Sequence, residues 1–233
     1  MILKDKTVLV TGGAVRLGRR LVDAFLAQKA RVALHYHTSE KAAHELNKVS
    51  RVHLFQANLA SFEEIHSLVN NVYKCLGTID VVINNAAIFY KTPFLKTTEK
   101  DYDTFMNINL KAVFFLSQLI AQRMKREAQP GVIIHIADVG GHVMWSDYMA
   151  YCLSKSGVLA LTKAMAKTLA PKIRVNCIVP GPLDFGEKTM KKRAQRTLLK
   201  KLGDPQDVVK AVLHAVTNDF MTGSCISVDG GVL

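Results

Sequence analysis

The sequence predicts one α/β domain in which a doubly wound parallel sheet of about seven strands is covered by helices on both faces. Short runs rich in β-branched residues alternate with longer segments of helical periodicity, a pattern typical of parallel strands joined by right-handed crossovers. The predicted strands are almost entirely apolar, as expected when helices bury both faces of a sheet. A glycine cluster between the first strand and the first helix lies where this architecture binds ligands.

The predicted strands are short and span residues 7–11, 31–36, 52–56, 80–84, 132–137, 173–178 and 224–228. The predicted helices have apolar positions at helical spacing and span residues 17–28, 40–49, 62–76, 102–125, 149–169 and 205–217. We find no repeat, low-complexity tract or linker that would divide the chain, so residues 1–233 are predicted to form a single domain. Functional residues are expected just beyond the carboxyl ends of the strands.

Composition argues against several classes of protein. Apolar residues make up 49% of the 233 residues and charged residues 21%, which suits a globular protein with a sizeable core. The longest apolar stretches are too short to span a bilayer, and no secretory signal is visible at the N-terminus. We therefore expect a cytoplasmic protein without a membrane partner. The four cysteines are scattered, so neither a disulfide framework nor a metal site is predicted.

The net charge of +12 leaves two interpretations open. A basic balance is the electrostatic footprint of a nucleic-acid partner, but the charges are spread along the chain and no such partner is predicted. One basic segment contains Lys188, Lys191, Lys192, Arg193, Arg196, Lys200 and Lys201. It is either a solvated helical face or a basic lid that attracts an anionic cofactor or substrate. Residues 183–203, which follow the sixth strand, are placed to form a substrate lid.

The connection between the first strand and the first helix predicts a dinucleotide site, although an ordinary tight turn would use the same residues. Gly12 and Gly18 allow the backbone to turn tightly and to approach a pyrophosphate. The helix that begins near Leu17 supplies amides and a positive dipole. Arg16 stands where many such loops have glycine. Its guanidinium can bind phosphate oxygens in a bidentate way; the alternative is a solvated arginine.

The end of the second strand favours NADP(H). An NAD-specific site usually places Asp or Glu here to bind the ribose 2′-hydroxyl, but residues 34–39 at the end of this strand contain no acid. His35, Tyr36, His37 and Ser39 instead offer groups that can donate hydrogen bonds to a 2′-phosphate, and Arg16 adds a positive charge. Successive residues of a strand face opposite sides, so the alternative for His35 or His37 is to pack inward at the end of the strand.

Tyr151 and Lys155 are spaced to act together in proton transfer. Residues four apart share a helix face, and a nearby ammonium favours the phenolate, so Lys155 is expected to lower the pKa of Tyr151. The tyrosine would then relay protons more readily near neutral pH. Such a pair is common by chance, but this one opens a long helix after the fifth strand. Asp138, at the carboxyl end of that strand, is predicted to be catalytic by orienting or sharing the proton of Tyr151; the alternative is a loop or capping carboxylate.

The whole chain resembles the short-chain dehydrogenase/reductase family, whose members bind a nicotinamide cofactor on a Rossmann-type sheet. The matching motifs occur in the family's order and cover nearly the full length. They are Thr11-Gly12 through Gly18, Asn84-Asn85-Ala86-Ala87, Asn107-Ile108-Asn109-Leu110, Tyr151 with Lys155, Pro180-Gly181, Thr222-Gly223 and Val228-Asp229-Gly230-Gly231.

The resemblance implies that Asn109, Tyr151 and Lys155 are catalytic. Lys155 would also bind the nicotinamide ribose, and Asn109 would help to position a water for the proton relay. Further cofactor contacts are implied from segments beyond the strand ends, at Asn58, Leu59, Asn85, Ala86, Pro180 and Gly181. A homotetramer built from the two long helices, residues 102–125 and 149–169, is also implied.

Three features resemble the pteridine reductase branch of this family, which includes dihydromonapterin reductases. Asp138 stands where most members carry serine, Arg16 replaces a loop glycine, and His35-Tyr36-His37 ends the second strand. The segment 84–90 is also similar, and the resemblance implies that Phe89 stacks on a pterin ring. A flat heterocycle is well held between an aromatic face and the nicotinamide, although a core aromatic would look the same in sequence.

This resemblance implies an enzyme that uses NADPH to reduce a dihydropterin (dihydromonapterin, dihydrobiopterin or dihydrofolate) to the tetrahydro form. Phe89, Asp138 and Tyr151 are the predicted substrate contacts. The departures from the pteridine reductase branch are Thr38, Asn58 and Ala87. One alternative is a carbonyl reductase such as a 3-oxoacyl-[acyl-carrier-protein] reductase, because carrier proteins are acidic and the predicted lid is basic. The other is a non-catalytic NADP-sensing protein of the same fold.

Overall fold

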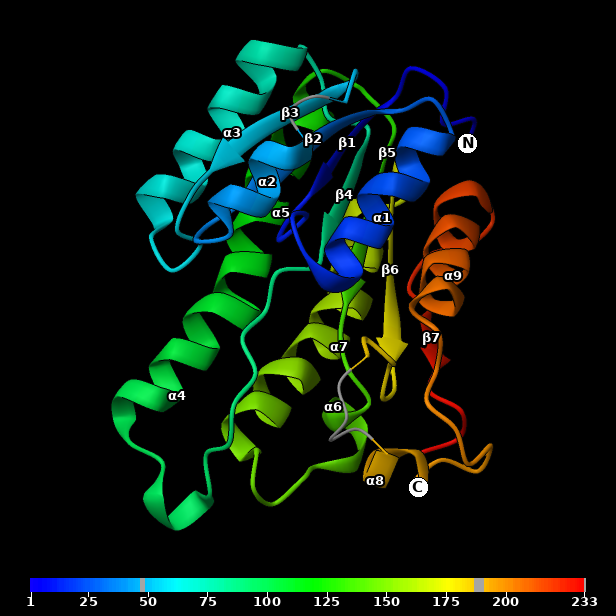
Figure 1. Cartoon of the computed structure of the whole chain (residues 1–233). Helices are drawn as coiled ribbons and strands as arrows, with labels where there is room; N and C mark the ends of the chain where they lie inside the picture. The colour runs from blue at the N-terminus through cyan, green and yellow to red at the C-terminus, as the bar shows by residue number, and fades with distance from the viewer. Residues whose placement is uncertain (47–48, 187–190, 233) are drawn as a thin grey trace.

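The structure, a computed structural model that describes residues 1–46, 49–186 and 191–232, confirms the predicted α/β architecture (Figure 1). The described strands are β1 (Thr7–Val10), β2 (Arg31–Tyr36), β3 (Val52–Gln56), β4 (Val81–Asn84), β5 (Gly131–Ile136), β6 (Ile173–Pro180) and β7 (Cys225–Val228). They form one parallel sheet in the order β3-β2-β1-β4-β5-β6-β7. The order reverses between β1 and β4, and in such sheets the crevice beyond this reversal binds ligands.

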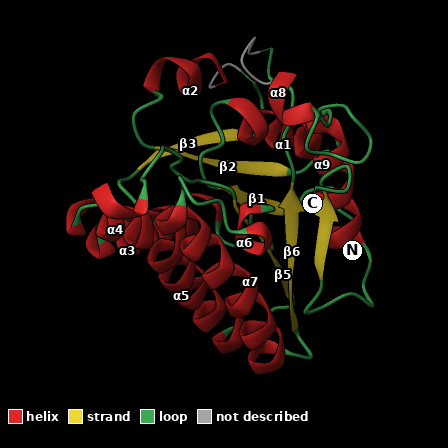
Figure 2. Cartoon of the chain, turned by 90° about the horizontal axis from the view of Figure 1, so that it is seen from below, coloured by secondary structure: helices red, strands yellow, loops and turns green. Residues whose placement is uncertain are grey.

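The described helices are α1 (Arg16–Ala27), α2 (Glu40–Leu46), α3 (Phe62–Leu76), η1 (Phe94–Lys96), α4 (Glu99–Met106), η2 (Asn107–Lys111), α5 (Ala112–Arg126), α6 (Gly140–Val143), α7 (Met149–Leu169), α8 (Lys191–Ala194) and α9 (Pro205–Thr217). One hydrophobic cluster joins α1, α2 and α9 to one face of the sheet, and another joins α3, α5 and α7 to the opposite face (Figure 2). This two-sided cover explains why the strands are almost entirely apolar.

Local signals set where several helices begin. Ser61 accepts a hydrogen bond from the Glu64 amide at the start of α3, and Thr98 forms a reciprocal capping box with Asp101 at the start of α4. These side chains satisfy amides that have no partner within the helix. Asp204 caps α9 in the same way.

The helix predicted at residues 102–125 is longer and is interrupted. It runs as α4, the single π-helical turn η2, and α5. Within the described residues, Glu99–Arg126 is the one helical stretch long and apolar enough to cross a membrane by length and composition. Several of its apolar side chains, including Leu116 and Ile120, belong to the core cluster shared with α3 and α7. Packing over the sheet therefore accounts for part of its apolar composition.

The predicted lid is held at both ends. Gly203 donates its amide hydrogen to Pro182, and the Asp184 amide donates to Gly203. Between them the structure describes residues 184–186, the short helix α8 and residues 195–202. Lys188 of the predicted basic segment lies outside the described residues, as do positions 47–48 of the helix predicted at residues 40–49.

Candidate active site

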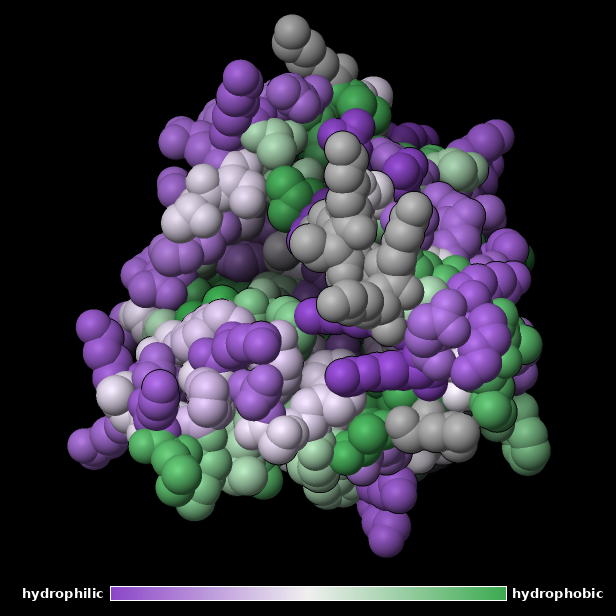
Figure 3. All heavy atoms as spheres, turned by 60° about the horizontal axis from the view of Figure 1, so that its bottom comes forward, coloured by the Kyte–Doolittle hydropathy of each residue, from purple (hydrophilic) through white to green (hydrophobic). Residues whose placement is uncertain are grey.

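A cavity of about 1040 Å³ opens at the carboxyl ends of the strands, and this side of the molecule is visibly hollowed (Figure 3). The volume is at the upper end of the range for ligand sites. Every residue predicted to contact the cofactor lines this cavity, from the glycine loop to Pro180 and Gly181. The predicted substrate contacts Phe89, Asp138 and Tyr151 also line it, whereas Asn109 does not.

The glycine loop has the geometry that the sequence predicted. Gly12 has φ +61°, a left-handed conformation that glycine adopts at little cost. A Cβ on Gly18 would lie 2.0 Å from the carbonyl oxygen of Gly12, so the start of α1 can approach the loop this closely only with glycine. Asn85 fastens the loop to the end of β4, because its Nδ2 donates to the carbonyls of Thr11 (2.9 Å) and Gly12 (3.2 Å).

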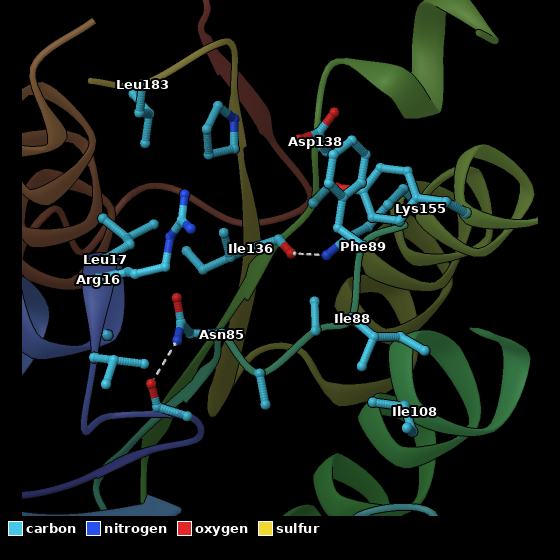
Figure 4. A pocket seen from close by; sticks show the side chains of 18 of the residues that line it. Arg16, Leu17, Asn85, Ile88, Phe89, Ile108, Ile136, Asp138, Lys155 and Leu183 are labelled. Atoms are coloured by element: carbon cyan, nitrogen blue, oxygen red, sulfur yellow. Dashed lines mark hydrogen bonds between the residues drawn. The ribbon is translucent and has the colours of Figure 1, made fainter. Parts of the chain in front are cut away.

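Arg16 also adopts a left-handed conformation, with φ +51°. This geometry explains why glycine is common at the position. The guanidinium lies 4.6 Å from the centre of the Phe185 ring, and Figure 4 shows Arg16 and Leu17 reaching into the cavity from α1. His37 and Thr38 are exposed at the same end of the cavity. Of the groups predicted to meet a 2′-phosphate, Arg16, His37 and Ser39 line this cavity, and Tyr36 lines it although it is only 7% exposed and belongs to the core cluster. One predicted donor is an exception.

The exception is His35, whose side chain packs inward. Its Nε2 lies 3.0 Å from the carbonyl of Ala57, and its Nδ1 accepts a hydrogen bond of 3.2 Å from the Gly12 amide. Burial lowers the pKa of His35 to about 4, so the ring is neutral with the proton on Nε2. Both ring nitrogens are engaged within the chain. The predicted donation from His35 to a 2′-phosphate is therefore wrong; the residue fixes the glycine loop instead.

Tyr151 and Lys155 lie in the first turns of α7 and are both buried. The Nζ of Lys155 donates to the carbonyl of Ile136 at 2.9 Å (Figure 4) and lies 5.8 Å from the centre of the Tyr151 ring. Burial, followed by the charge of Asp138, raises the pKa of Tyr151 well above its usual range. This direction is opposite to the one predicted from Lys155 alone, because the prediction left out burial and the carboxylate.

Asp138 stands beside this pair at the end of β5. Its Oδ1 accepts from the Gly140 amide at 2.7 Å, and its carboxylate also hydrogen-bonds with the Tyr151 side chain. Burial raises the pKa of Asp138 although the Gly140 amide and Lys155 act in the opposite direction. The carboxylate therefore fixes the turn that precedes α6, as expected of a loop carboxylate, and also faces Tyr151. One group serves both roles.

Asn109 lies in the π-helical turn η2 and is 1% exposed. Its Oδ1 accepts from the Ile88 amide at 2.9 Å, and its Nδ2 donates to the Ile88 carbonyl at 3.1 Å and to Ser154 Oγ at 3.2 Å. π-Helical turns are frequent at functional sites. Here the turn directs Asn109 at the backbone that carries Ile88 and Phe89 into the cavity.

An aromatic wall completes the end of the cavity near Tyr151. Phe89 is 42% exposed, so it is a cavity residue and not part of the core. Its ring stacks on Tyr148 with a centroid distance of 4.7 Å and an interplanar angle of 1°, and it meets Tyr151 edge-on at 4.7 Å. Trp145 lies edge-on to Phe89 at 6.4 Å.

Sequence reasoning missed Trp145 and Tyr148 as lining residues, and it left open whether Arg193 and Arg196 of the basic segment face solvent or a ligand; both line the cavity. Trp145 and Tyr148 stand just before Tyr151 in the chain, and a Trp and a Tyr so close to the predicted site were the available signal. Arg193 lies 5.4 Å over the Phe89 ring. The part of the predicted basic lid near Arg193 and Arg196 thus borders the cavity.

Comparison with known proteins agrees with this geometry. A family model described as enoyl-(acyl carrier protein) reductase matches residues 13–233. L-xylulose reductase of Mus musculus is 32% identical, covering 99% of this chain and 98% of its own length. A 3-oxoacyl-[acyl-carrier-protein] reductase of Thermotoga maritima is 30% identical over the full length of both chains. The crystal structure of a blue fluorescent protein from a metagenomic library, in complex with NADPH, superposes with a TM-score of 0.91 and 28% identity over 99% of each chain.

Proposed function

Because the chain belongs to the short-chain dehydrogenase/reductase family, we propose that it is an NADPH-dependent enzyme that reduces a C=N bond of a dihydropterin. The product is the corresponding tetrahydropterin. The observation that carries the proposal is the carboxyl group of Asp138, held against Tyr151 where most family members have serine.

A carboxylate suits a pterin better than a ketone. The pyrimidine half of a pterin presents N–H donors, and a carboxylate is an acceptor with two oxygens. One oxygen of Asp138 accepts from the Gly140 amide, which leaves acceptor capacity on the other. A hydroxyl in place of Asp138 would polarise a carbonyl by donating a hydrogen bond, which an ionised carboxylate cannot do.

The aromatic wall suits a flat heterocycle. Phe89, Trp145 and Tyr148 line the same end of the cavity as Tyr151. Offset stacking and edge-to-face contacts with a ring add stabilisation beyond the area they bury. A small aliphatic ketone would use little of this surface.

The residues present fit a dinucleotide with a 2′-phosphate. The close approach at Gly18 and the left-handed Gly12 shape a loop that a pyrophosphate can approach. Arg16, His37 and Thr38 line the end of the cavity where the 2′-phosphate of NADPH would be held. Bound NADPH supplies the hydride that the substrate carbon receives.

Tyr151 supplies the proton to the substrate nitrogen. Its raised pKa keeps the hydroxyl protonated, as a proton donor requires. Lys155 is held by Ile136 within reach of the ring, where its positive charge stabilises the phenolate left after transfer. Asp138 orients the hydroxyl of Tyr151, and Asn109 positions the backbone of Ile88 in the segment that follows β4.

A carbonyl reductase acting on an acyl thioester is the second candidate. It is favoured by the Thermotoga maritima relative and by the basic side chains at the cavity mouth. Asp138 in place of the family's serine argues against it.

The test is NADPH oxidation with dihydromonapterin, dihydrobiopterin, dihydrofolate and acetoacetyl thioesters as substrates. We expect turnover of the dihydropterins, and a loss of about 10²–10⁴-fold for Tyr151→Phe with NADPH binding retained. Asp138→Ser should lose dihydropterin reduction selectively. Activity on thioesters alone, or undiminished dihydropterin turnover in Tyr151→Phe, would refute the proposal.

A homotetramer assembled through α5 and α7 belongs to the same proposal. Phe114 on α5 and Leu153 on α7 are 41% and 44% exposed, and apolar side chains on long helices are suited to burial between subunits. Light scattering of the purified protein tests this, and a monomer at micromolar concentration would contradict it.

A further inference from the structure

A smaller cavity of about 370 Å³ adjoins the active site. The two cavities share three lining residues, Trp145, Arg196 and Val232. The smaller one is otherwise lined by apolar side chains such as Leu198 and by polar ones that include Lys200. The two cavities are therefore neighbours that meet at Trp145 and Arg196, and the smaller one has mixed apolar and basic character.

Two arginines lie near this boundary, Arg193 on the side of the main cavity and Arg196 on both sides. Arg193 lies 5.4 Å over the Phe89 ring, and its positive charge lowers the pKa of both Asp138 and Tyr151. Arg196 lines both cavities and is exposed. In the part of the chain that the structure describes, neither guanidinium forms a salt bridge with a carboxylate. A guanidinium can bind a carboxylate or a phosphate in a bidentate way.

We propose that Arg193, Arg196 and the side pocket form a subsite for an anionic substituent, a carboxylate or a phosphate, carried by the substrate. This inference rests on the proposed function for the identity of the ring, which would be a dihydropterin. The ring lies against Phe89 and Tyr151, and its substituent passes Arg193 and enters the side pocket beside Arg196. Discrimination between dihydropterins then depends on the charge of the substituent, because the ring is common to all.

The first test compares dihydropterins that differ in the substituent. Dihydrofolate carries carboxylates, a dihydropterin with a phosphorylated side chain carries phosphate, and dihydrobiopterin is neutral. We expect kcat/KM to be at least about tenfold higher for the anionic substrates, in line with one hydrogen bond to a charged group. The anionic group, carboxylate or phosphate, that gives the larger increase in kcat/KM is the one for which the subsite is suited. Arg193→Gln and Arg196→Gln should each remove most of this preference through KM.

Arg126→Gln is the matched control. It removes the same charge at the C-terminal end of α5, where the side chain is 70% exposed. Because α5 runs antiparallel to the strands, this end lies on the side of the sheet away from the cavity. Arg126→Gln should leave the ratio of kcat/KM for each anionic substrate to that for dihydrobiopterin unchanged. An unaltered ratio of anionic to neutral substrate in the Arg193→Gln/Arg196→Gln double variant would overturn the subsite.

A binding measurement separates the subsite from the reaction. p-Aminobenzoyl-glutamate has the charged tail of dihydrofolate without the pterin, and Trp145, the one tryptophan of the sequence, lines both cavities. We expect this fragment to quench Trp145 fluorescence in the wild type and to bind at least about fivefold more weakly in the double variant. Equal affinities would refute the subsite. Quenching without dihydropterin turnover would leave the subsite standing and refute the proposed reaction.

Discussion

Replacing His35 with a side chain that cannot titrate should flatten the dependence of stability on pH. In the folded chain His35 donates to Ala57 and accepts from Gly12, and burial lowers its pKa from 6.5 to about 4. Between these two values the unfolded chain binds more protons than the folded chain. The contribution of the neutral imidazole to stability is therefore fully present above pH 6.5 and is lost as the pH falls toward 4.

The magnitude follows from the shift. A difference of about 2.5 pH units, at about 1.4 kcal/mol per unit, corresponds to about 3 kcal/mol of unfolding free energy lost by pH 4. His135, which is fully buried and has its pKa lowered to about 3, destabilises the chain over the same range. Comparing wild type with a His35 variant isolates the part of the lost unfolding free energy that is due to His35.

The assay is urea unfolding of wild type and His35→Asn at intervals from pH 7 to pH 4.5. Asparagine keeps an acceptor and a donor but does not titrate. We expect the loss of unfolding free energy over this range to be smaller in the variant by about 2–3 kcal/mol. His37→Asn, a change at an exposed neighbour, should behave as the wild type does. Parallel curves for wild type and His35→Asn would refute the assignment of His35 as a buried neutral imidazole.

Two further predictions concern the glycine loop. Gly18→Ala places a methyl group 2.0 Å from the Gly12 carbonyl oxygen. We therefore expect the variant to be less stable by about 1–3 kcal/mol in thermal denaturation and to bind NADPH more weakly in a titration. An unchanged affinity for NADPH would contradict the close approach of α1 to the loop. Arg16→Gly relieves a left-handed conformation that costs roughly 1 kcal/mol but gives the unfolded chain more freedom, so stability should change by less than about 1 kcal/mol. Its preference for NADPH over NADH should fall about tenfold, as expected when one charged hydrogen bond to phosphate is lost. A constant preference would show that Arg16 does not meet the 2′-phosphate.

Most of the fold could be predicted from the sequence because its signals are local. Each strand is a short apolar run between turn residues, and observed bounds such as Thr7–Val10 and Ile173–Pro180 differ from the predictions by at most two residues. The helix at residues 102–125 was predicted as continuous because residues 107–111 contain no Gly or Pro that would signal a break. The interruption at Asn107–Lys111 has no signature in periodicity.

The candidate site was likewise predictable from the sequence only in part. The order of motifs is enough to bring the glycine loop, Asn85, Asp138, Tyr151 and Lys155 to one edge of the sheet, because parallel strands place their carboxyl ends together. The direction of a pKa shift depends instead on burial and on partners from other segments, as the raised pKa of Tyr151 shows.

The same dependence on tertiary contacts explains why the roles of His35 and Arg193 could not be predicted from the sequence. His35 and His37 are equivalent in sequence, and only the packing of Ala57 and Gly12 around one ring makes that ring structural. Arg193 comes from a basic run like many solvated helical faces, and its place over Phe89 requires two segments a hundred residues apart to meet. Residue order thus determines the sheet and the edge at which chemistry gathers. Tertiary contacts determine which side chains face the cavity and in which protonation state, because desolvation and hydrogen bonding act through space.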